Sequence, residues 1–473
     1  MNASFKKTKI IATIGPASNN KKILKEMISL GVNCARINTA HGDFDQYTQL
    51  IKLIRSVADI PIMIDIKGPE IRIKTNEEIE ITATNPVDFG FNNKSDAYFN
   101  YNFYDEVSVG DTIFFDNGLI TSHILKKYKD RQGNKIVTLK FNSNVVIKPN
   151  KGVNIPNRKL KIPSLSSKDI EAVKFSIDQK ISFIALSFAR NKEDILNLKK
   201  LLGKSPIKII AKIENMEGID AIDEIIEHSD GVMIARGDLG IEIPSEKIPS
   251  LQKMIIRKCN EKGKVSIVAT QMLESMITNP VPTRAEVSDV ANAVLDGTDA
   301  VMLSGETASG RHPVKAVEVM RRVAMESENN VTHNVDNTET GDISHEMSEA
   351  AYRLSIHSKA TKIISITRSG FSARLISRFK PKVPIIAVMI DPEVSRQVQL
   401  VWGVEPMLLE KIPTRAIMPT IADLLMKKKM LEKKDLVVFL GGIRTMKEHM
   451  SNVVEIHNIG DMIEYDRKYR GKF

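Results

Sequence analysis

Eight short apolar runs recur along the first two-thirds of the chain, most of them near-continuous in β-branched residues. Such runs, with helical stretches between them, are typical of parallel strands that are covered on both faces. Eight βα repeats predict a (β/α)8 TIM barrel, an α/β fold whose chemistry lies at the C-terminal ends of its strands. The predicted strands are 9–14, 32–37, 60–66, 183–187, 207–213, 231–235, 265–270 and 300–303.

A long stretch without helical periodicity separates the third run from the fourth. Residues 68–156 contain short alternating runs at 79–84, 112–115, 136–141 and 145–147, with turn signals such as Asp116-Asn-Gly118 between them. This pattern predicts a small β-barrel domain inserted in a loop of the larger barrel. An insertion at the catalytic end of the barrel is well placed to act as a lid.

A third domain is predicted after the eighth run. A helix at 313–325 and a polar connection at 326–342 precede an alternation of helices and strands, which indicates a layered α/β domain. We expect helices at 344–357, 371–379 and 415–428, and strands at 362–366, 384–390, 436–440 and 453–456. The predicted domains are therefore the barrel at 1–67 and 157–330, the lid at 68–156 and the C-terminal domain at 345–473.

The charge and composition of the chain restrict its partners. The net charge is +10, but the chain has one Trp, 5% aromatic residues and no basic run interleaved with aromatics, so we expect no nucleic acid as a partner. A positive field attracts anionic substrates equally well. No run approaches 18 uninterrupted apolar residues, so we expect no membrane-spanning helix.

The start of the chain and its cysteines indicate a cytoplasmic protein. Residues 1–7 contain no apolar core of signal-peptide length. Cys34 and Cys259 each lie beside apolar residues, which favours two buried free thiols over a disulfide or a nucleophile.

The stretch from Lys212 to Asp238 carries the chemistry that is easiest to interpret. Lys212 and Glu214 end one apolar run, Arg236 and Asp238 end the next, and residues 218–228 between them are predicted to form a helix. The two strands are then parallel neighbours, about 4.8 Å apart, and both carboxylates emerge side by side. We expect them to hold a hard divalent cation, Mg²⁺ or Mn²⁺, rather than to be two solvated loop carboxylates.

Cations beside these carboxylates predict an anionic, phosphorylated substrate. Lys212 is either an ion-pair partner or an electrophile at a phosphoryl group, and we favour the second. The turn Ala235-Arg236-Gly237-Asp238 offers backbone amides to a carboxylate or phosphate, and Arg236 adds charge. Polar residues also follow other predicted strands: Arg36, Asn38, Asp65, Lys67, Thr270 and Ser304.

Two further segments superficially resemble phosphate sites. Gly203-Lys-Ser205 lacks the earlier Gly and the preceding strand of a P-loop, so we interpret it as a loop that ends a helix. In the last domain, Thr367, Arg368, Ser369, Gly370 and Ser372 follow a predicted strand and open a helix. This segment is either an effector nest for phosphate or a simple helix cap at Ser369 or Ser372.

Long motifs in one fixed order resemble the pyruvate kinase family over nearly the whole chain. The resemblance implies transfer of the phosphoryl group of phosphoenolpyruvate to ADP, giving pyruvate and ATP. It also implies a homotetramer, with the segment around Arg284 and Glu286 at a subunit contact. The motifs are Thr13-Ile-Gly-Pro-Ala-Ser18, Ala35-Arg-Ile-Asn38, His41-Gly42, Asp65-Ile-Lys-Gly-Pro-Glu70-Ile-Arg72, Asp116-Asn-Gly118, Lys151-Gly-Val-Asn-Ile-Pro156, Thr270-Gln-Met-Leu-Glu274, Pro282-Thr-Arg-Ala-Glu286 and Met302-Leu-Ser-Gly-Glu306.

The resemblance assigns roles to individual residues. Arg36 and Lys212 would face the transferring phosphoryl group, Glu214 and Asp238 would hold Mg²⁺, and a second Mg²⁺ would arrive with ADP. The turn amides of Ala235, Arg236, Gly237 and Asp238 would receive the substrate carboxylate. Thr270 would lie near the enolate carbon, and Ser304 would belong to the proton path. The nucleotide would contact Pro16, Asn38, His41, Arg72, Asp116 and Lys151.

Two departures from the family pattern bear on activation. Ala40 stands where the family commonly has a serine whose hydroxyl binds an activating K⁺. Asn38, Asp65 and Ile66 remain as ligands for a monovalent cation, and Glu70 stands where K⁺-dependent members carry Glu. Because Ala40 cannot supply the serine hydroxyl, we nevertheless expect reduced dependence on K⁺. The region 441–447 has no Trp, which disfavours a sugar bisphosphate as effector.

Two other functions share some of these features. A metal-dependent lyase on a related barrel would also use a Glu/Asp pair, but the inserted β-domain and the pairing with Lys212 argue against it. A catalytically silent sensor would bind phosphorylated ligands through the last domain, but Arg36, Lys212 and Thr270 are retained.

Overall fold

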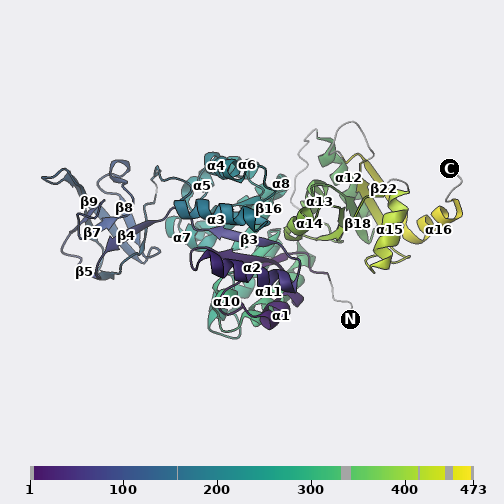
Figure 1. Ribbon diagram of the computed structural model, residues 1–473, viewed down its shortest axis with the longest axis horizontal. Helices are drawn as coiled ribbons and strands as arrows, with labels where there is room; N and C mark the ends of the chain where they lie inside the picture. Colours follow the sequence, from purple (N-terminus) through teal and green to yellow (C-terminus); the bar gives the residue numbers. More distant parts are fainter. Residues whose placement is uncertain (1–4, 157, 332–341, 414–415, 443–450, 470–473) are drawn as a thin grey trace.

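The computed structural model describes residues 5–156, 158–331, 342–413, 416–442 and 451–469. Three bodies follow one another along the long axis of the molecule (Figure 1): an inserted β-domain at one end, a barrel in the middle and a C-terminal domain at the other end. Of the described helices, none is long and apolar enough to cross a membrane.

The middle body is a closed barrel of eight parallel strands, as the sequence predicts. Its strand order is β1-β17-β16-β15-β14-β13-β3-β2. Most of the strands are buried along their entire length, which explains their near-continuous apolar runs. The strands are β1 (Lys9–Thr13), β2 (Val32–Asn38), β3 (Ile62–Ile66), β13 (Phe183–Leu186), β14 (Lys208–Ile213), β15 (Gly231–Ala235), β16 (Val265–Ala269) and β17 (Ala300–Leu303).

Helices between the strands cover the barrel. Several begin at side-chain caps: Ser166 and Asp169 form a capping box at α3, and Thr283 and Glu286 form another at α9. The helices are α1 (Lys21–Ser29), α2 (Phe44–Val57), α3 (Ser167–Asp178), α4 (Lys192–Leu202), α8 (Ile248–Glu261), α9 (Arg284–Leu295) and α11 (Pro313–Ser327). Gly203, with φ of 58°, ends α4, so the interpretation of Gly203-Lys-Ser205 as a helix-ending loop is confirmed.

The helix predicted at 218–228 is wrong in its extent, because the structure has two helices there. They are α5 (Met216–Asp220) and α6 (Ile222–His228), separated by Ala221. Asn215 caps α5 by accepting a hydrogen bond from the Gly218 amide at 2.8 Å, so the helix starts directly after the strand. Gly218 is required there, since a Cβ on it would lie 2.6 Å from the Ala189 carbonyl oxygen.

The inserted domain follows β3 and forms a second closed barrel. Its seven strands have the order β10-β6-β7-β4-β12-β8-β9, and β11 (Val145–Ile147) pairs with β5 (Ile79–Ile81) beside them. Phenylalanines fill its core, among them Phe89, Phe99 and Phe115. The barrel strands are β4 (Ile71–Thr75), β6 (Val87–Gly90), β7 (Ala97–Phe99), β8 (Thr112–Phe115), β9 (Ile120–Lys129), β10 (Lys135–Phe141) and β12 (Gly152–Asn154).

The C-terminal domain is a five-stranded sheet with helices packed on it. Its order is β20-β19-β18-β21-β22, parallel except for β22. The sequence analysis missed β20, α14 and α16, and the predicted start of one helix at Arg415 lies outside the described residues. The elements are α12 (Ile343–His357), β18 (Lys362–Ile366), α13 (Phe371–Ser377), β19 (Ile385–Met389), α14 (Pro392–Gln397), β20 (Val404–Leu408), α15 (Ile417–Lys427), β21 (Leu436–Gly441), β22 (Val453–Asn458) and α16 (Ile459–Tyr469).

Candidate active site

Three strands on one side of the barrel bring three of the predicted polar residues together at its mouth. Arg36 lies on β2, Asp65 on β3, and Lys212 on β14, and each lies in the C-terminal half of its strand. The prediction that β14 and β15 are parallel neighbours is confirmed, since Lys212 pairs with Met233 in the register. The register thus places the Lys212 and Arg236 ends of two strands side by side.

The cations and carboxylates at the mouth form one buried network. Asp65 accepts a hydrogen bond from Arg36 Nε at 2.8 Å through Oδ2, and its Oδ1 lies 3.2 Å from Lys212 Nζ. Lys212 Nζ also lies 2.8 Å from Glu214 Oε1. Arg36 Nη1 donates to the hydroxyl of Thr13 at 2.8 Å. Two cations and two carboxylates therefore hold one another in place before any ligand arrives.

The network shifts the pKa values of its members in opposite directions. For Asp65, burial favours the neutral form, but the charges of Lys212 and Arg36 outweigh it and lower its pKa. For Lys212, burial opposes the charge, yet Asp65 and Glu214 raise its pKa, so the ammonium is permanently charged near neutral pH. Burial, with the added repulsion of Asp238, raises the pKa of Glu214 to about 7 in spite of Lys212.

Ser187 is a member of this network that the sequence analysis did not single out. Its hydroxyl accepts a hydrogen bond from Lys212 Nζ at 2.7 Å and donates to the Ile66 carbonyl at 2.7 Å. The residue directly follows β13, the strand between β3 and β14. The available signal was its position as a polar residue at the end of an apolar run. The sequence analysis instead counted Ser187 as the last residue of the predicted strand 183–187.

Glu214 and Asp238 fit a divalent cation. Glu214 Oε2 accepts a hydrogen bond from the Phe188 amide at 2.7 Å, and the two carboxylates follow β14 and β15, which are neighbours in the barrel. The described residues contain no group of three or more His, Cys, Asp or Glu side chains arranged for a metal. Two protein carboxylates supplemented by water and ligand oxygens are the arrangement that Mg²⁺ commonly adopts.

The side chain of Arg236 does not supply charge to these carboxylates, which corrects the expectation from the sequence. Its guanidinium makes a two-pronged ion pair with Asp289 of α9, at 2.6 Å for each nitrogen, and Nη2 donates to the Thr270 carbonyl at 3.1 Å. The residue begins the short helix α7 (Arg236–Glu242) directly after β15. Only its backbone remains available to a ligand at the turn.

Thr270 lies against the same turn. Its hydroxyl accepts a hydrogen bond from the Gly237 amide at 2.7 Å and donates to the Ala269 carbonyl at 2.6 Å. Thr270 and Gln271 both have left-handed backbones, with φ of 65° and 54°, which is costly for non-glycine residues and often found at functional sites. Ser304 lies at the end of the next strand, β17, and its amide donates to Glu306 Oε2 at 2.7 Å.

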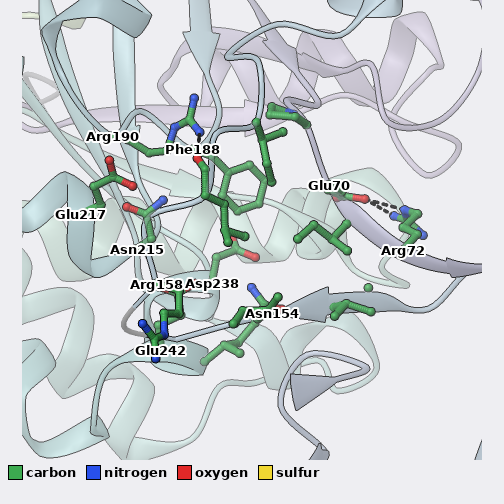
Figure 2. Close-up of a pocket in the computed structure, with 18 of the residues that line it drawn as sticks. Glu70, Arg72, Asn154, Arg158, Phe188, Arg190, Asn215, Glu217, Asp238 and Glu242 are labelled. Carbon is green, nitrogen blue, oxygen red and sulfur yellow. Dashed lines mark hydrogen bonds and ion pairs between the residues drawn. The ribbon is translucent and has the colours of Figure 1, made fainter. Parts of the chain in front are cut away.

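A cavity of about 540 Å³ lies between the inserted domain and the barrel mouth. Figure 2 shows Glu70 and Arg72 on one side of it and Asn215, Glu217 and Arg190 on the other. Asp238 lines the cavity, as do the predicted nucleotide residues Arg72, Asp116 and Lys151, whereas Pro16, Asn38 and His41 are not among its lining residues. Lys151 pairs with Asp116 at 2.7 Å, and Arg72 Nε donates to Glu70 at 2.6 Å.

The predicted ligands of a monovalent cation are engaged in internal hydrogen bonds. The Asp65 carbonyl accepts the amide and hydroxyl of Thr39 at 3.0 and 2.9 Å, and Asn38 Oδ1 accepts the Ala40 amide at 3.0 Å. The Ile66 carbonyl accepts from Ser187. Ala40 has no oxygen on its side chain with which to add to this set.

Family models and solved structures agree on what the chain resembles. A model described as "Pyruvate kinase, barrel domain" matches residues 5–317, and "Pyruvate kinase, alpha/beta domain" matches residues 345–457. The chain belongs to the pyruvate kinase family. The fold and the family predicted from the sequence are thereby confirmed.

Individual pyruvate kinases align over most of the chain. The enzyme of Bacillus licheniformis is 44% identical over 425 residues, covering 85% of this chain and 71% of the relative. That of Geobacillus stearothermophilus is 40% identical over 484 residues, covering 97% and 81%. The crystal structure of a pyruvate kinase from Cryptosporidium parvum superposes with a TM-score of 0.89 at 35% identity, covering 96% of both chains.

Pyruvate kinases need a divalent metal ion, and Glu214 and Asp238 are the residues here whose chemistry suits one.

The predicted effector nest lies in the C-terminal domain, far along the chain from these residues. Gly370, with φ of 73°, stands at the N-terminus of α13, and neither Ser369 nor Ser372 caps the helix. Ser372 is instead buried and bonded to the Ser365 hydroxyl at 3.1 Å.

Proposed function

We propose that this member of the pyruvate kinase family transfers the phosphoryl group of phosphoenolpyruvate to ADP, with Lys212 and Arg36 at the transferring group. The observation that carries the residue assignment is the buried ammonium of Lys212, held by Asp65, Glu214 and Ser187 at the barrel mouth. Phosphoryl transfer depends on charge stabilisation and in-line positioning more than on covalent chemistry. Cations fixed before the substrate binds pay no reorganisation cost in the transition state.

Glu214 and Asp238 would hold one Mg²⁺ or Mn²⁺, and a second divalent ion would arrive with ADP. When bound, the metal would supply positive charge that stabilises the charge developing during transfer. Glu214 would also orient Lys212, since the same carboxylate lies 2.8 Å from Lys212 Nζ. Burial, and to a smaller extent repulsion from Asp238, raises the pKa of Glu214, and a bound cation would relieve that repulsion.

The carboxylate of phosphoenolpyruvate would bind at the turn of Ala235, Arg236, Gly237 and Asp238. Gly237 permits close approach, and its amide donates to Thr270, so ligand binding would exchange one acceptor for another. Thr270 would then lie beside the enolate carbon that must be protonated. Ser304, at the end of the neighbouring strand, would belong to the path of that proton.

The inserted domain would close as a lid over the nucleotide. Asp116, Lys151 and Arg72 face the cavity from the lid side, and we assign Pro16, Asn38 and His41 to the barrel side of the nucleotide. Closure would exclude water, which otherwise competes with ADP for the phosphoryl group. The cavity supports this proposal because it already lies between the two domains.

Potassium is expected to have a reduced effect on turnover. Asn38, Asp65 and Ile66 are the remaining ligands, and all three already accept internal hydrogen bonds. A rate in buffer free of Na⁺ and K⁺ that is at least about tenfold below the rate in K⁺ would contradict this expectation, on the scale of one hydrogen-bonding ligand.

Assembly and regulation are further parts of the proposal. By family resemblance we expect a homotetramer, with the segment that contains Arg284 and Glu286 at a subunit contact. Glu286 accepts hydrogen bonds from the Ser275 hydroxyl and the Thr283 amide. A phosphorylated effector would bind at Thr367, Arg368, Ser369, Gly370 and Ser372. Size-exclusion chromatography with light scattering tests the first expectation.

A coupled assay of pyruvate formation from phosphoenolpyruvate and ADP tests the function directly. We expect activity only with a divalent metal, and we expect Glu214→Gln and Asp238→Asn to raise the half-saturating metal concentration at least about tenfold. Glu217→Gln is the matched control, because Glu217 lines the same cavity without belonging to the network. An unchanged metal requirement in the first two variants would reject the ligand assignment, and no pyruvate with any metal would reject the function.

A further inference from the structure

A small pocket lies between the base of the barrel and the C-terminal domain, at the opposite end of the barrel from the candidate active site. Gly263, Lys264 and Val265 line it from the barrel, and Arg374, Arg378 and Val401 line it from the C-terminal domain. Val265 is the first residue of β16, so the pocket lies at the N-terminal end of the barrel strands. It has about 10 Å³ of room for water-sized groups. That is enough for a water molecule, or for one oxygen of a larger anion that enters from the open side of this pocket.

Arg378 is the most deeply placed cation of the pocket. Its side chain belongs to a residue that is 4% exposed, and its Nε has no hydrogen-bond partner. Nη1 donates to the Glu261 carbonyl at 3.1 Å and lies 2.8 Å from His345 Nδ1. A buried guanidinium with a free donor is costly to the fold unless something outside the chain accepts that donor.

Arg374 and Lys264 add two more positive charges. Arg374 Nη1 donates to the Ser369 carbonyl at 3.1 Å, and Lys264 Nζ donates to the carbonyls of Ser229 and Glu227 at 2.5 and 3.2 Å. Burial lowers the pKa of Lys264, Arg374 and Arg378 alike. Each of these cations is therefore bonded to neutral groups while it is partly removed from water.

No carboxylate pairs with any of the three cations within the part of the chain that the structure describes. Asp299 also lines the pocket, but it is 2.9 Å from Lys380 and accepts the Trp402 amide at 3.1 Å. Asp230 attracts Lys264 and Arg374 at longer range, and its own pair is with Lys208 at 2.9 Å. Glu349 and Glu346 likewise attract Arg378 without pairing with it directly. Buried cations without a directly bonded carboxylate are rare in folded proteins, and an anion that bonds them directly would stabilise this cluster.

We propose that this pocket binds a phosphoryl oxyanion, either free phosphate or a phosphomonoester, which bridges the barrel and the C-terminal domain. Arg378 Nε and the remaining guanidinium donors of Arg374 would bond its oxygens, and Lys264 would add a point charge. Arginine is well suited to this task because its fixed fork of donors matches the geometry of a phosphate group. The site is separate from the active site and from the segment 367–372, although Arg374 contacts that segment through the Ser369 carbonyl.

Thermal unfolding of the full chain in phosphate and in chloride buffers of equal ionic strength tests the site. Inorganic phosphate at about ten times its dissociation constant should raise the melting temperature by about 1–2 °C more than chloride does. Arg374→Gln and Arg378→Gln should each lose this difference, and Lys264→Gln should reduce it. Lys262→Gln removes an exposed charge two residues away and should keep it.

The active site also attracts phosphate, but it is intact in all four variants, so the difference between variants isolates the pocket. Glycerol phosphate, tested beside inorganic phosphate, identifies the ligand: a shift with both assigns the phosphoryl group, and a shift with the free ion alone assigns free phosphate. If Arg378→Gln fails to fold, the partly exposed Arg374 and Lys264 carry the test. A phosphate shift of full size in Arg374→Gln, or no shift in the wild type, would overturn the proposal.

Discussion

The two ends of the barrel treat buried cations in opposite ways. At the mouth, Lys212 and Arg36 are paired with Asp65 and Glu214 at 2.7 to 3.2 Å. At the base, Arg378 and its neighbours bond only carbonyls and an imidazole. The mouth is thus a network in which each cation is already paired and oriented, whereas at the base no described carboxylate pairs directly with Arg378, Arg374 or Lys264. Carboxylate partners therefore distinguish a preorganised catalytic network from a cluster of cations suited to binding an anion.

Replacing the central cation of the mouth should have the largest effect. Lys212→Met leaves the cavity and both substrates in place but removes the charge at the phosphoryl group, so we expect turnover to fall by about 10³-fold or more. Calorimetric titration should show that phosphoenolpyruvate and ADP still bind. Lys208→Met is the control, because Lys208 lies on the same strand and pairs with Asp230 at its other end. Near-normal turnover in Lys212→Met would defeat the assignment.

The hydroxyl that holds Lys212 should matter less than the charge itself. Ser187→Ala removes one hydrogen bond at 2.7 Å and leaves both carboxylate partners, so we expect a fall in kcat of about tenfold with little change in KM, as for one hydrogen bond to a charged group. Ser187→Thr keeps a hydroxyl and should restore most of the activity. If kcat does not fall in Ser187→Ala, the carboxylates alone position the lysine.

The architecture followed from the sequence where periodicity is strong and local. Eight runs were enough for the barrel because both faces of each strand are buried. The missed strand β20 contains Pro406 and lies at an edge of its sheet, where a proline is tolerated but weakens the sequence signal. In the inserted domain, β9 was missed because its solvent-facing lysines hide the alternation.

The sequence predicted those parts of the site that depend only on the order of the strands along the chain. Glu214 and Asp238 follow strands that are close in the sequence, so their meeting was foreseeable. The ion pair of Arg236 with Asp289 was not, because it depends on which face of α9 turns toward the barrel. The position of Ser187 under Lys212 depends in the same way on contacts between β13 and β14 that no local pattern encodes.

A carboxylate at the rim of the mouth should give the protein a measurable pH dependence. Burial raises the pKa of Glu242 to about 7, with Met216 and Asn154 donating weak compensating hydrogen bonds. The folded state therefore binds the proton more tightly than the unfolded chain, and this stabilisation, complete below the ordinary value near 4.5, is lost as the pH rises through 7. In Glu242→Gln, the melting temperature should fall by a few degrees less between pH 5 and pH 8 than in the wild type.

Parallel melting curves for the two variants at several pH values measure that difference. Glu246→Gln, an exposed position on the segment after α7, controls for the loss of a surface charge. If the melting temperatures of the two variants depend on pH in the same way, the pKa of Glu242 is not raised, and water reaches the rim of the cavity more freely than the burial of Glu242 indicates.

Replacing a cation at the base should have the smallest effect. The change in the free energy of unfolding should distinguish the base of the barrel from its mouth. Lys264→Gln removes a cation that has no carboxylate partner among the described residues, so in phosphate-free buffer we expect a change within about 1 kcal/mol in the free energy of unfolding, or a gain. Lys212→Gln removes the partner of two buried carboxylates and should cost about 3–5 kcal/mol. Chemical denaturation of both variants gives the two values. A large loss in Lys264→Gln would mean that its charge is balanced within the chain, and the base would then resemble the mouth.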